Sequence, residues 1–420
     1  MTDIHHDTAV LKPLVAELLQ RAAQPRQDQL KKLWADHQAM RPTGKIPVCV
    51  YYEGIPSTQW QVILGDNAAP LCRTAIGRHI ENDLRQRLWI AANVPDDHIV
   101  WPTVTVRPAM ARNVDWGVAF GLSGSKNPED ARHFTPVFTD GIDVSRLKFA
   151  DMEVDAAATA AAIEQAHELV GPGVKVFVQY GHLGYCPFDV AVQMRGMDSI
   201  MYDVIDCPDK VHAMMEFLTA AHVQHHLNRE KRGWINIFPS DDGRYTAFGW
   251  RVHSAYLADD FHSRMPALRD EWAYVSAQTS SGLGPDMYAQ FVQPYNQRLA
   301  SLFCNKTVYY HGCECLDQKL DVLAGLANLR RFHVSPWSSV PAAAAKFAGK
   351  AVLEVHSHPG RVFFGQTQAQ MKADLQELIR QASTAQLDLN LSDIHNVNNQ
   401  PHVLTAWAQA AQEVSGNINP

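Results

Sequence analysis

The chain has 420 residues, of which 46% are hydrophobic and 19% are charged. This composition is typical of a globular protein with a large core, and it excludes a disordered or low-complexity chain. The 37 basic and 44 acidic side chains give a net charge of −7, which leaves no basic surplus for a nucleic-acid backbone. No run approaches the roughly 18 apolar residues of a membrane span, and residues 1–7 lack the pattern of a signal peptide. We therefore expect a cytoplasmic protein that binds neither nucleic acid nor membrane.

The first part of the chain predicts a helical segment followed by a strand. Residues 11–40 place apolar side chains at helical spacing. The short β-prone run from Ile46 to Tyr51 comes next and is predicted as the first strand. A helix through Leu84 and a strand over residues 99–106 follow. The glycine- and proline-rich stretch at 115–143 is expected to be irregular.

From residue 154 onward, predicted helices and strands alternate with short connections. The predicted helices cover residues 154–170, 187–195, 208–229, 285–303, 316–326, 340–348, 368–384 and 401–414. The predicted strands cover residues 174–180, 272–277, 307–310, 331–334, 351–355 and 387–391. Such alternation implies parallel strands joined by right-handed helical crossovers.

About eight predicted strands favour a closed (β/α)8 barrel, a TIM barrel, over an open sheet. No glycine-rich phosphate fingerprint follows the early strands, which argues against a dinucleotide-binding fold. No stretch is long or polar enough to act as a linker between domains. The sequence therefore predicts an α/β fold in which residues 1–45 form an N-terminal helical segment packed on a single barrel domain, residues 46–420.

Catalytic groups of such barrels lie at the C-terminal ends of the strands, and several polar side chains occupy these positions. The predicted substrate-binding residues are Tyr51, Tyr52, Tyr180, Gln278 and His356. Two further residues near strand ends, Glu53 and Glu314, are the predicted catalytic residues, because a carboxyl group there can transfer a proton as a general acid.

The segment His311-Gly312-Cys313-Glu314-Cys315 carries the sharpest chemical signal. An imidazole and a thiolate two residues apart, leaving one strand, can bind one Zn²⁺ ion from the same side, and coordination keeps the thiol deprotonated. A redox pair of Cys313 and Cys315 is the alternative. The remaining ligands must come from elsewhere, and the candidates are Asp393, His395, His356 and His358. The predicted metal set is His311, Cys313 and Asp393.

The same region carries a family resemblance. Residues 272–303, with the runs Gly-Pro-Asp-Met-Tyr and Phe-Val-Gln-Pro-Tyr, lead directly into Val-Tyr-Tyr-His-Gly-Cys-Glu at 308–314. This arrangement resembles the uroporphyrinogen decarboxylase superfamily, in which a helix near a Pro-Tyr pair precedes a strand leading to His-x-Cys. Pro187-Phe188 and Arg195-Gly196-Met197 are similar to the middle of the same family.

The resemblance implies one of two chemistries. True uroporphyrinogen decarboxylases are metal-free and carry an arginine-rich N-terminal signature, whereas residues 47–60 contain no arginine. The corrinoid-linked methyltransferases of the superfamily hold zinc with His-x-Cys and a later cysteine, and Ser392-Asp393 stands near that later position. The closer likeness implies a zinc-dependent methyltransferase that moves a methyl group between a small, for example methoxylated, molecule and a corrinoid (cobalamin) carried by a partner protein.

Two other functions are compatible with the sequence. One is a metal-free decarboxylase of a small carboxylated substrate, and the other is a non-catalytic accessory protein that binds a corrinoid or a metal. Zinc content separates the methyltransferase from the decarboxylase, and turnover separates it from the accessory protein. The substrate, the direction of methyl transfer and the oligomeric state are left open by the sequence.

Overall fold

The computed structural model describes residues 3–119, 122–124, 132–184, 186–238, 245–246, 265–303, 307–382 and 385–416. Its centre is a sheet of six parallel strands in the order β1-β14-β13-β12-β11-β10. These strands are β1 (Val48–Val50), β10 (Ala273–Ser276), β11 (Val308–His311), β12 (Leu329–Val334), β13 (Val352–Ser357) and β14 (Leu387–Leu391). A second parallel pair joins β2 (Thr103–Val106) to β7 (Lys175–Val178).

The other described strands form short antiparallel pairs. They are β3 (Met110–Arg112) with β6 (Glu153–Val154), β4 (Leu122–Gly124) with β5 (Arg132–Phe134), and β8 (Ile237–Phe238) with β9 (Tyr245–Thr246). The first two pairs lie between β2 and α5. The strands β4 and β5 fall within residues 115–143, the stretch predicted to be irregular, whereas β3 and β6 lie on either side of it.

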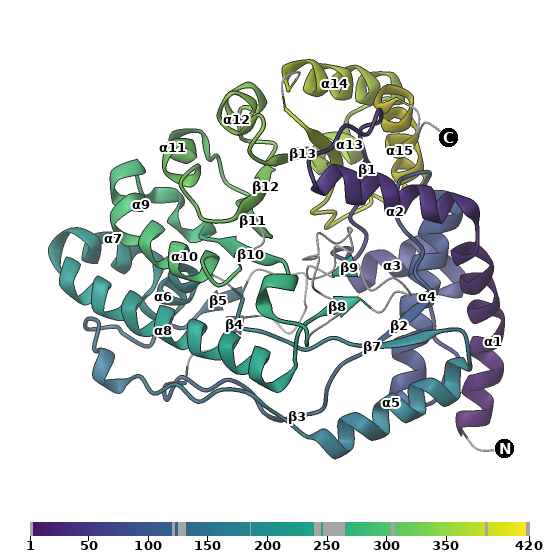
Figure 1. Ribbon diagram of the computed structural model, residues 1–420, viewed down its shortest axis with the longest axis horizontal. Helices are drawn as coiled ribbons and strands as arrows, with labels where there is room; N and C mark the ends of the chain where they lie inside the picture. Colours follow the sequence, from purple (N-terminus) through teal and green to yellow (C-terminus); the bar gives the residue numbers. More distant parts are fainter. Residues whose placement is uncertain are drawn as a thin grey trace.

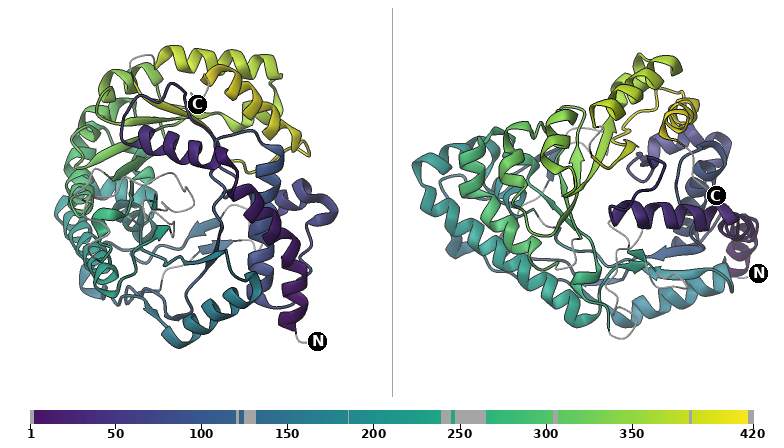
Figure 2. Two further views of the ribbon diagram at one scale, coloured as in Figure 1. Left: turned by 45° about the vertical axis from the view of Figure 1, so that its right-hand side comes forward. Right: turned by 45° about the horizontal axis from the view of Figure 1, so that its top comes forward.

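Helices lie towards the periphery of the molecule and the parallel strands nearer its middle (Figures 1 and 2). The helices are α1 (Asp3–Ala22), α2 (Pro25–Gln38), α3 (Ser57–Leu64), α4 (Ala75–Asn93), α5 (Ala156–Val170), α6 (Pro187–Arg195), α7 (Met197–Asp206), α8 (Pro208–Arg232), α9 (Pro285–Phe291), α10 (Gln293–Ala300), α11 (Leu320–Leu323), α12 (Val340–Phe347), α13 (Pro359–Phe364), α14 (Gln368–Gln381) and α15 (His402–Ser415). Within the described ranges, no helix combines the length and the apolar character that a bilayer crossing requires.

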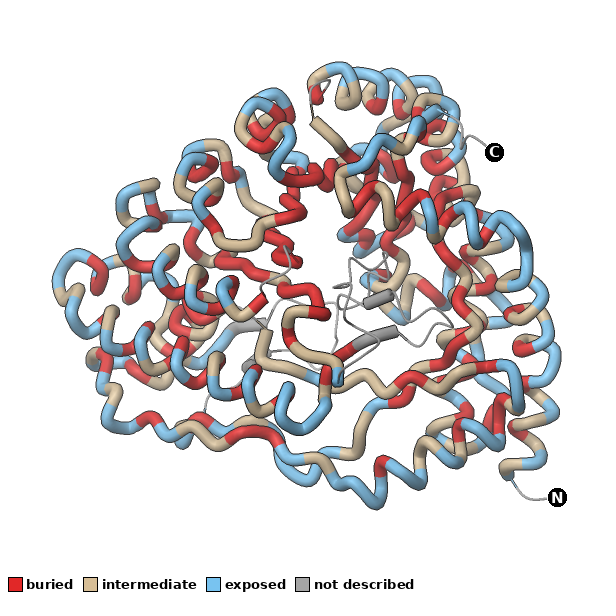
Figure 3. Tube along the Cα trace, viewed as in Figure 1, coloured by how far each residue is buried: buried red, intermediate tan, exposed pale blue. Residues whose placement is uncertain are grey.

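The two faces of the six-stranded sheet have opposite chemistry. Side chains alternate between the faces of a strand, and the face towards the helices is apolar, as Phe332 of β12 shows by stacking on Phe347 of α12 with ring centroids 4.2 Å apart. The opposite face carries Arg331, whose guanidinium binds Glu354 at 2.5 Å and Asp388 at 2.6 Å. All of these residues are buried, and burial is concentrated along these strands in Figure 3. A sheet with a charged inner face is unusual, because buried charges must be paired to be tolerated.

Side chains complete the hydrogen bonding of β1 on the side away from β14. The N–H groups of Val48 and Val50 donate to the carboxylates of Asp97 and Asp96, each at 2.9 Å, and the N–H of Asp97 donates to the Val48 carbonyl. Buried backbone groups must find partners, so these two carboxylates supply the acceptors that a neighbouring strand would otherwise provide.

Helix α2 packs its apolar side against the inner residues of both parallel sheets. Trp34 belongs to a buried cluster that includes Cys49 of β1, Tyr51 directly after β1, and Phe177 of β7. Its indole N–H donates to the Asp97 carbonyl at 2.8 Å, and His37 Nε2 lies 2.8 Å from an Asp388 oxygen. The N-terminal segment therefore contributes to the core that the strands enclose.

The predicted alternation of strands and helices is confirmed from α5 to α15, with boundaries that shift by a few residues. The prediction of one helix over 285–303 is wrong, because the segment forms α9 and α10 with a break at Val292. Pro294 explains the break, since proline lacks an N–H and disfavours the helical conformation before it. Helix α7 was missed; it begins immediately after Gly196, whose φ of 92° ends α6.

Candidate metal centre

Three potential metal ligands meet at the C-terminal ends of two neighbouring strands. β11 ends at His311, Cys313 follows two residues later, and His333 stands one residue before the end of β12. Their ligand atoms all lie within 4.8 Å of one another. His311 Nε2 is 3.1 Å from Cys313 Sγ, and the rings of His311 and His333 are 4.2 Å apart. This group, His311–Cys313–His333, offers one sulfur and two nitrogen atoms.

The backbone between His311 and Cys313 has little conformational freedom. A Cβ atom at Gly312 would lie 2.8 Å from the Glu314 carboxylate and 3.0 Å from Leu316, so only glycine fits without displacing neighbours. Gln278, at the start of the turn after β10, directs its side-chain N–H at Cys313 Sγ over 3.6 Å. Gln278, predicted to bind the substrate, therefore lies next to Cys313.

Behind the ligands runs a network of buried hydrogen bonds that crosses three strands. Tyr309 Oη lies 2.8 Å from His311 Nδ1 and 3.1 Å from His333 Nδ1, and it donates to Glu354 Oε1 at 2.7 Å. His356 Nε2 also approaches Glu354 Oε1 at 2.7 Å, while its Nδ1 lies 2.7 Å from Ser392 Oγ. Two residues of this network, His356 and the nearby Tyr51, were predicted as substrate contacts. Tyr51 stacks on His356 and reaches Glu354 over 3.5 Å.

The structure does not place Asp393 with His311 and Cys313. Asp393 is exposed, has a φ of 55°, and accepts a long hydrogen bond of 3.4 Å from Ser392. The left-handed backbone turns the chain away as it leaves β14, and His395 is exposed as well. His358 caps the N-terminus of α13 through its ring nitrogen and packs on Trp337. Among the described residues, the place of the expected third ligand next to His311 and Cys313 is taken by His333.

The two predicted catalytic carboxylates lie in different surroundings. Glu314 packs over Gly312, and burial raises its pKa to about 7 against the opposing charge of Lys319. Lys319 is itself buried and donates to the Ser280 carbonyl at 2.7 Å. Glu53 is half-buried, and its charge acts on Tyr52 and Arg87.

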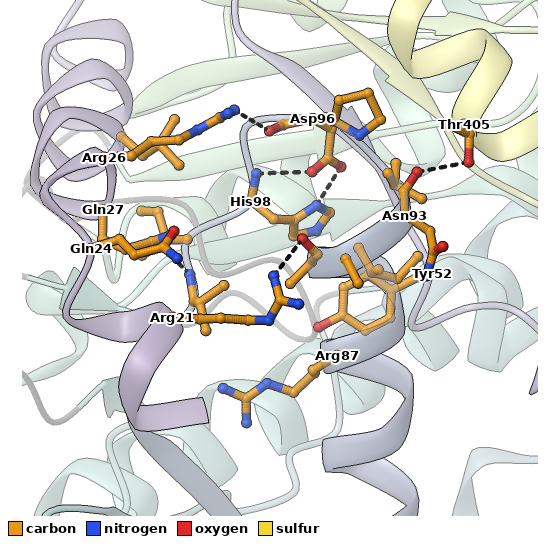
Figure 4. A pocket seen from close by; sticks show the side chains of 18 of the residues that line it. Arg21, Gln24, Arg26, Gln27, Tyr52, Arg87, Asn93, Asp96, His98 and Thr405 are labelled. Atoms are coloured by element: carbon orange, nitrogen blue, oxygen red, sulfur yellow. Dashed lines mark hydrogen bonds and ion pairs between the residues drawn. The ribbon is translucent and has the colours of Figure 1, made fainter. Parts of the chain in front are cut away.

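Tyr52 lines a separate polar cavity of about 530 Å³. Neighbouring residues of an extended segment point to opposite sides, so Tyr51 reaches the inner face while Tyr52 packs against His98 with ring centroids 5.1 Å apart. Figure 4 shows Arg21, Arg26 and Arg87 around this cavity, with His98 held by Asp96. Burial raises the pKa of Tyr52 well above its usual range.

The remaining predictions concern Tyr180 and the thiol pair. Tyr180 follows β7, stacks on Trp234 with ring centroids 5.3 Å apart, and shares two hydrogen bonds with the Asn236 side chain through its backbone. Cys313 and Cys315 do not form a disulfide bond with each other; Cys313 is half-buried and Cys315 is exposed.

The sequence analysis missed three functional candidates, His333, Tyr309 and Glu354. All three lie inside strands, whereas the search was confined to strand ends. A signal for them exists: polar residues recur every second position in four successive strands, as in Tyr309 with His311, or Glu354 with His356. Such alternation in otherwise apolar strands indicates that one face lines a polar interior.

Comparisons with known proteins support the fold but do not assign the chain to a family. No protein-family model matches the sequence, and no curated protein sequence matches it. The structure is similar to a solved structure of a methyltransferase from Methanosarcina mazei, with a TM-score of 0.53 and 14% sequence identity over 91% of this chain and 98% of that chain. At this level of identity the similarity establishes a shared fold.

Proposed function

We propose that this protein is a zinc-dependent methyltransferase related to the corrinoid-linked branch of the uroporphyrinogen decarboxylase superfamily. The observation that carries the proposal is the His311–Cys313–His333 group at the C-terminal ends of β11 and β12. Active sites of parallel α/β folds lie at that end of the strands. The fold shared with a methyltransferase supports methyl transfer as the proposed reaction class.

We further propose that the two parallel sheets are arcs of one closed barrel, six strands from one sheet and two from the other. The shared cluster around Trp34 supports closure, because it contains inner residues of both β1 and β7. The carboxylates of Asp96 and Asp97 then bridge the seam between β1 and β2 in place of ladder hydrogen bonds.

The donor set fits zinc. Zinc accepts thiolate and imidazole ligands in tetrahedral geometry, and catalytic sites have three protein ligands with a fourth position for water or substrate. When bound, zinc supplies a Lewis acid for an oxygen or sulfur atom of the substrate. Cys313 contributes one negative charge and the two imidazoles contribute none. We propose His333 in place of Asp393 as the third ligand.

The surrounding residues have proposed roles that follow from their positions. Gln278, with its N–H directed at Cys313, orients the thiolate or the substrate atom next to it. Tyr51 and His356 line the inner face beyond the ligands. Glu314, adjacent to Cys313 in the chain, is the proposed proton donor, and Glu53 is the alternative.

The single-thiolate ligand set suggests the class of substrate. A site with one thiolate transfers less electron density to the ion than a site with two, so it favours activation of an ether oxygen over a highly nucleophilic thiolate. We therefore propose a methoxylated small molecule as the methyl donor and a corrinoid on a partner protein as the acceptor. We also propose a cytoplasmic location, because seven cysteines in 420 residues is an ordinary number for a protein of the reducing cytosol.

Metal analysis and methyl transfer together test the proposal. The purified protein, reconstituted with zinc and dialysed, is expected to retain one zinc per chain and to move methyl groups between methoxylated compounds and free cobalamin. The variants His311→Ala and Cys313→Ala are expected to lose both properties. A protein that contains no metal but decarboxylates a small carboxylated substrate would favour the decarboxylase function. A zinc-loaded protein without any turnover would favour the accessory function.

A further inference from the structure

The hydroxyl group of Tyr309 occupies an unusual position between the two imidazole ligands. Tyr309 is 1% exposed, and its oxygen lies 2.8 Å from His311 Nδ1 and 3.1 Å from His333 Nδ1. The same oxygen donates its proton to Glu354 Oε1 at 2.7 Å. One phenol thus contacts both histidines through the same ring atom, Nδ1, although the histidines belong to different strands.

The direction of each hydrogen bond follows from Glu354. Arg331 donates to Glu354 Oε2 at 2.5 Å and is itself fixed by two bonds to Asp388, so the Glu354 carboxylate is the acceptor both for Arg331 and for the Tyr309 hydroxyl. The single proton of the phenol is therefore committed to Glu354. The lone pairs of Tyr309 Oη remain, and they accept from N–H groups.

From this geometry we infer that Tyr309 is a positioning residue that holds both imidazoles in the same tautomer, with the proton on Nδ1. A neutral imidazole carries one proton, so a proton on Nδ1 leaves the Nε2 lone pair for a metal ion. In His311, that Nε2 atom already lies 3.1 Å from Cys313 Sγ. The inference rests on the proposed function, because it assigns His311 and His333 as ligands.

The same network explains why the neighbouring group of His333, Glu354 and His356, whose ligand atoms are equally close, is not a second metal site. Both oxygens of Glu354 are engaged by Arg331, Tyr309 and His356. Ser392 engages the other nitrogen of His356. These residues orient the ligands of the first group, as outer residues commonly do around metal-binding histidines.

A pair of tyrosine variants on one strand tests the inference. Tyr309→Phe removes the hydroxyl between the histidines. Tyr310→Phe is the matched control, since Tyr310 is equally buried but faces the helices, where its hydroxyl lies 2.9 Å from that of Tyr288. Zinc affinity, measured by competition with a chromophoric chelator, is expected to fall about 10–100-fold in Tyr309→Phe and to stay unchanged in Tyr310→Phe. The cobalt(II) absorption spectrum is expected to change only in Tyr309→Phe.

The outcomes separate this inference from the function on which it rests. A wild-type protein that binds no zinc overturns the proposed function. A wild-type protein that binds zinc, with Tyr309→Phe binding equally well, overturns the inference alone. If Tyr309→Phe fails to fold, nitrogen NMR of the metal-free wild-type protein labelled at histidine, assigned with His311→Gln and His333→Gln, gives the answer. Protonated Nδ1 in both rings supports the inference, and protonated Nε2 in either ring contradicts it.

Discussion

Two groups in this protein contain similar metal-binding side chains in very different surroundings. Beside His311–Cys313–His333, the carboxylate of Glu354 lies outside the group and accepts a hydrogen bond from Tyr309, whose oxygen lies 2.8 Å from His311 Nδ1. In Cys49–Asp96–His98, the carboxylate of Asp96 belongs to the group itself and is occupied by the backbone N–H groups of Val50 and His98 and by the His98 ring. The comparison teaches that residue types alone do not make a metal site. Whether such a group can bind a metal depends on which hydrogen bonds already occupy its donor atoms.

The thiols of the two groups also differ in how deeply they are buried. Cys49 is fully buried, and burial raises its pKa to about 12, although His98 Nε2 lies 3.7 Å from the sulfur and opposes the shift. Cys313 is only half-buried and stands at a strand end. We therefore interpret the Cys49 group as a structural connection between β1 and the chain that precedes β2.

The largest expected effect is on zinc content, and it distinguishes the His311–Cys313–His333 group from the Cys49–Asp96–His98 group. Alanine at His311 or Cys313 should reduce bound zinc from one equivalent to almost none, because two remaining ligands do not hold the ion. Alanine at Cys49 should leave the zinc content unchanged. Metal analysis of the dialysed proteins measures both, and loss of zinc in Cys49→Ala with retention in Cys313→Ala would reverse the assignment.

The next effect concerns the charged face that supports the first group. Arg331→Met leaves Glu354 and Asp388 buried without their cation, which should lower the free energy of unfolding by about 3–5 kcal/mol. Lys372→Met is the control, because Lys372 pairs with Glu413 at the surface and such pairs contribute about 0–1 kcal/mol. Urea denaturation compares the two, and equal stabilities would show that the inner network is not held by Arg331.

A smaller effect is expected at the second group. Asp96→Asn weakens the acceptor for two backbone N–H groups and the His98 ring, which should cost about 1–3 kcal/mol of stability. Zinc content should not change, because Asp96 is assigned a structural role. A variant of full stability that has lost zinc would contradict that role and make the Cys49 group the metal site.

The smallest effect is expected at Asp393. Because Asp393 is exposed and does not belong to the His311–Cys313–His333 group, Asp393→Ala should keep the zinc affinity of the wild-type protein, whereas His333→Ala should lose it. The chelator competition assay ranks the two variants, and the opposite ranking would restore Asp393 as the third ligand.

Most helices and strands were predictable, because hydrophobic periodicity and the proline and glycine residues at element ends are local signals. Helix α6 matches its predicted span, Pro187–Arg195, since Pro187 and Gly196 mark its ends. The short antiparallel strands between β2 and α5 were not predictable, because no local sequence signal in this segment specifies how they pair. The break at Val292 carried a local signal in Pro294 that the helical pattern obscured.

The site was predictable only in part, because its members come from several strands. His311 and Cys313 are close in sequence, so their spacing revealed them. His333 joins them through the pairing of β11 with β12, a contact between distant segments that spacing does not encode. Asp393 was expected because it follows a strand, but the backbone conformation that turns it outward depends on the loop after β14.

X-ray absorption spectroscopy of the zinc-loaded protein tests the central claim most directly. The account predicts one zinc per chain with a single sulfur neighbour at about 2.3 Å and at least two nitrogen neighbours at about 2.0–2.1 Å, and it predicts that the sulfur contribution disappears in Cys313→Ser. A protein that retains no zinc, or a zinc ion whose nearest neighbours include no sulfur, would contradict it.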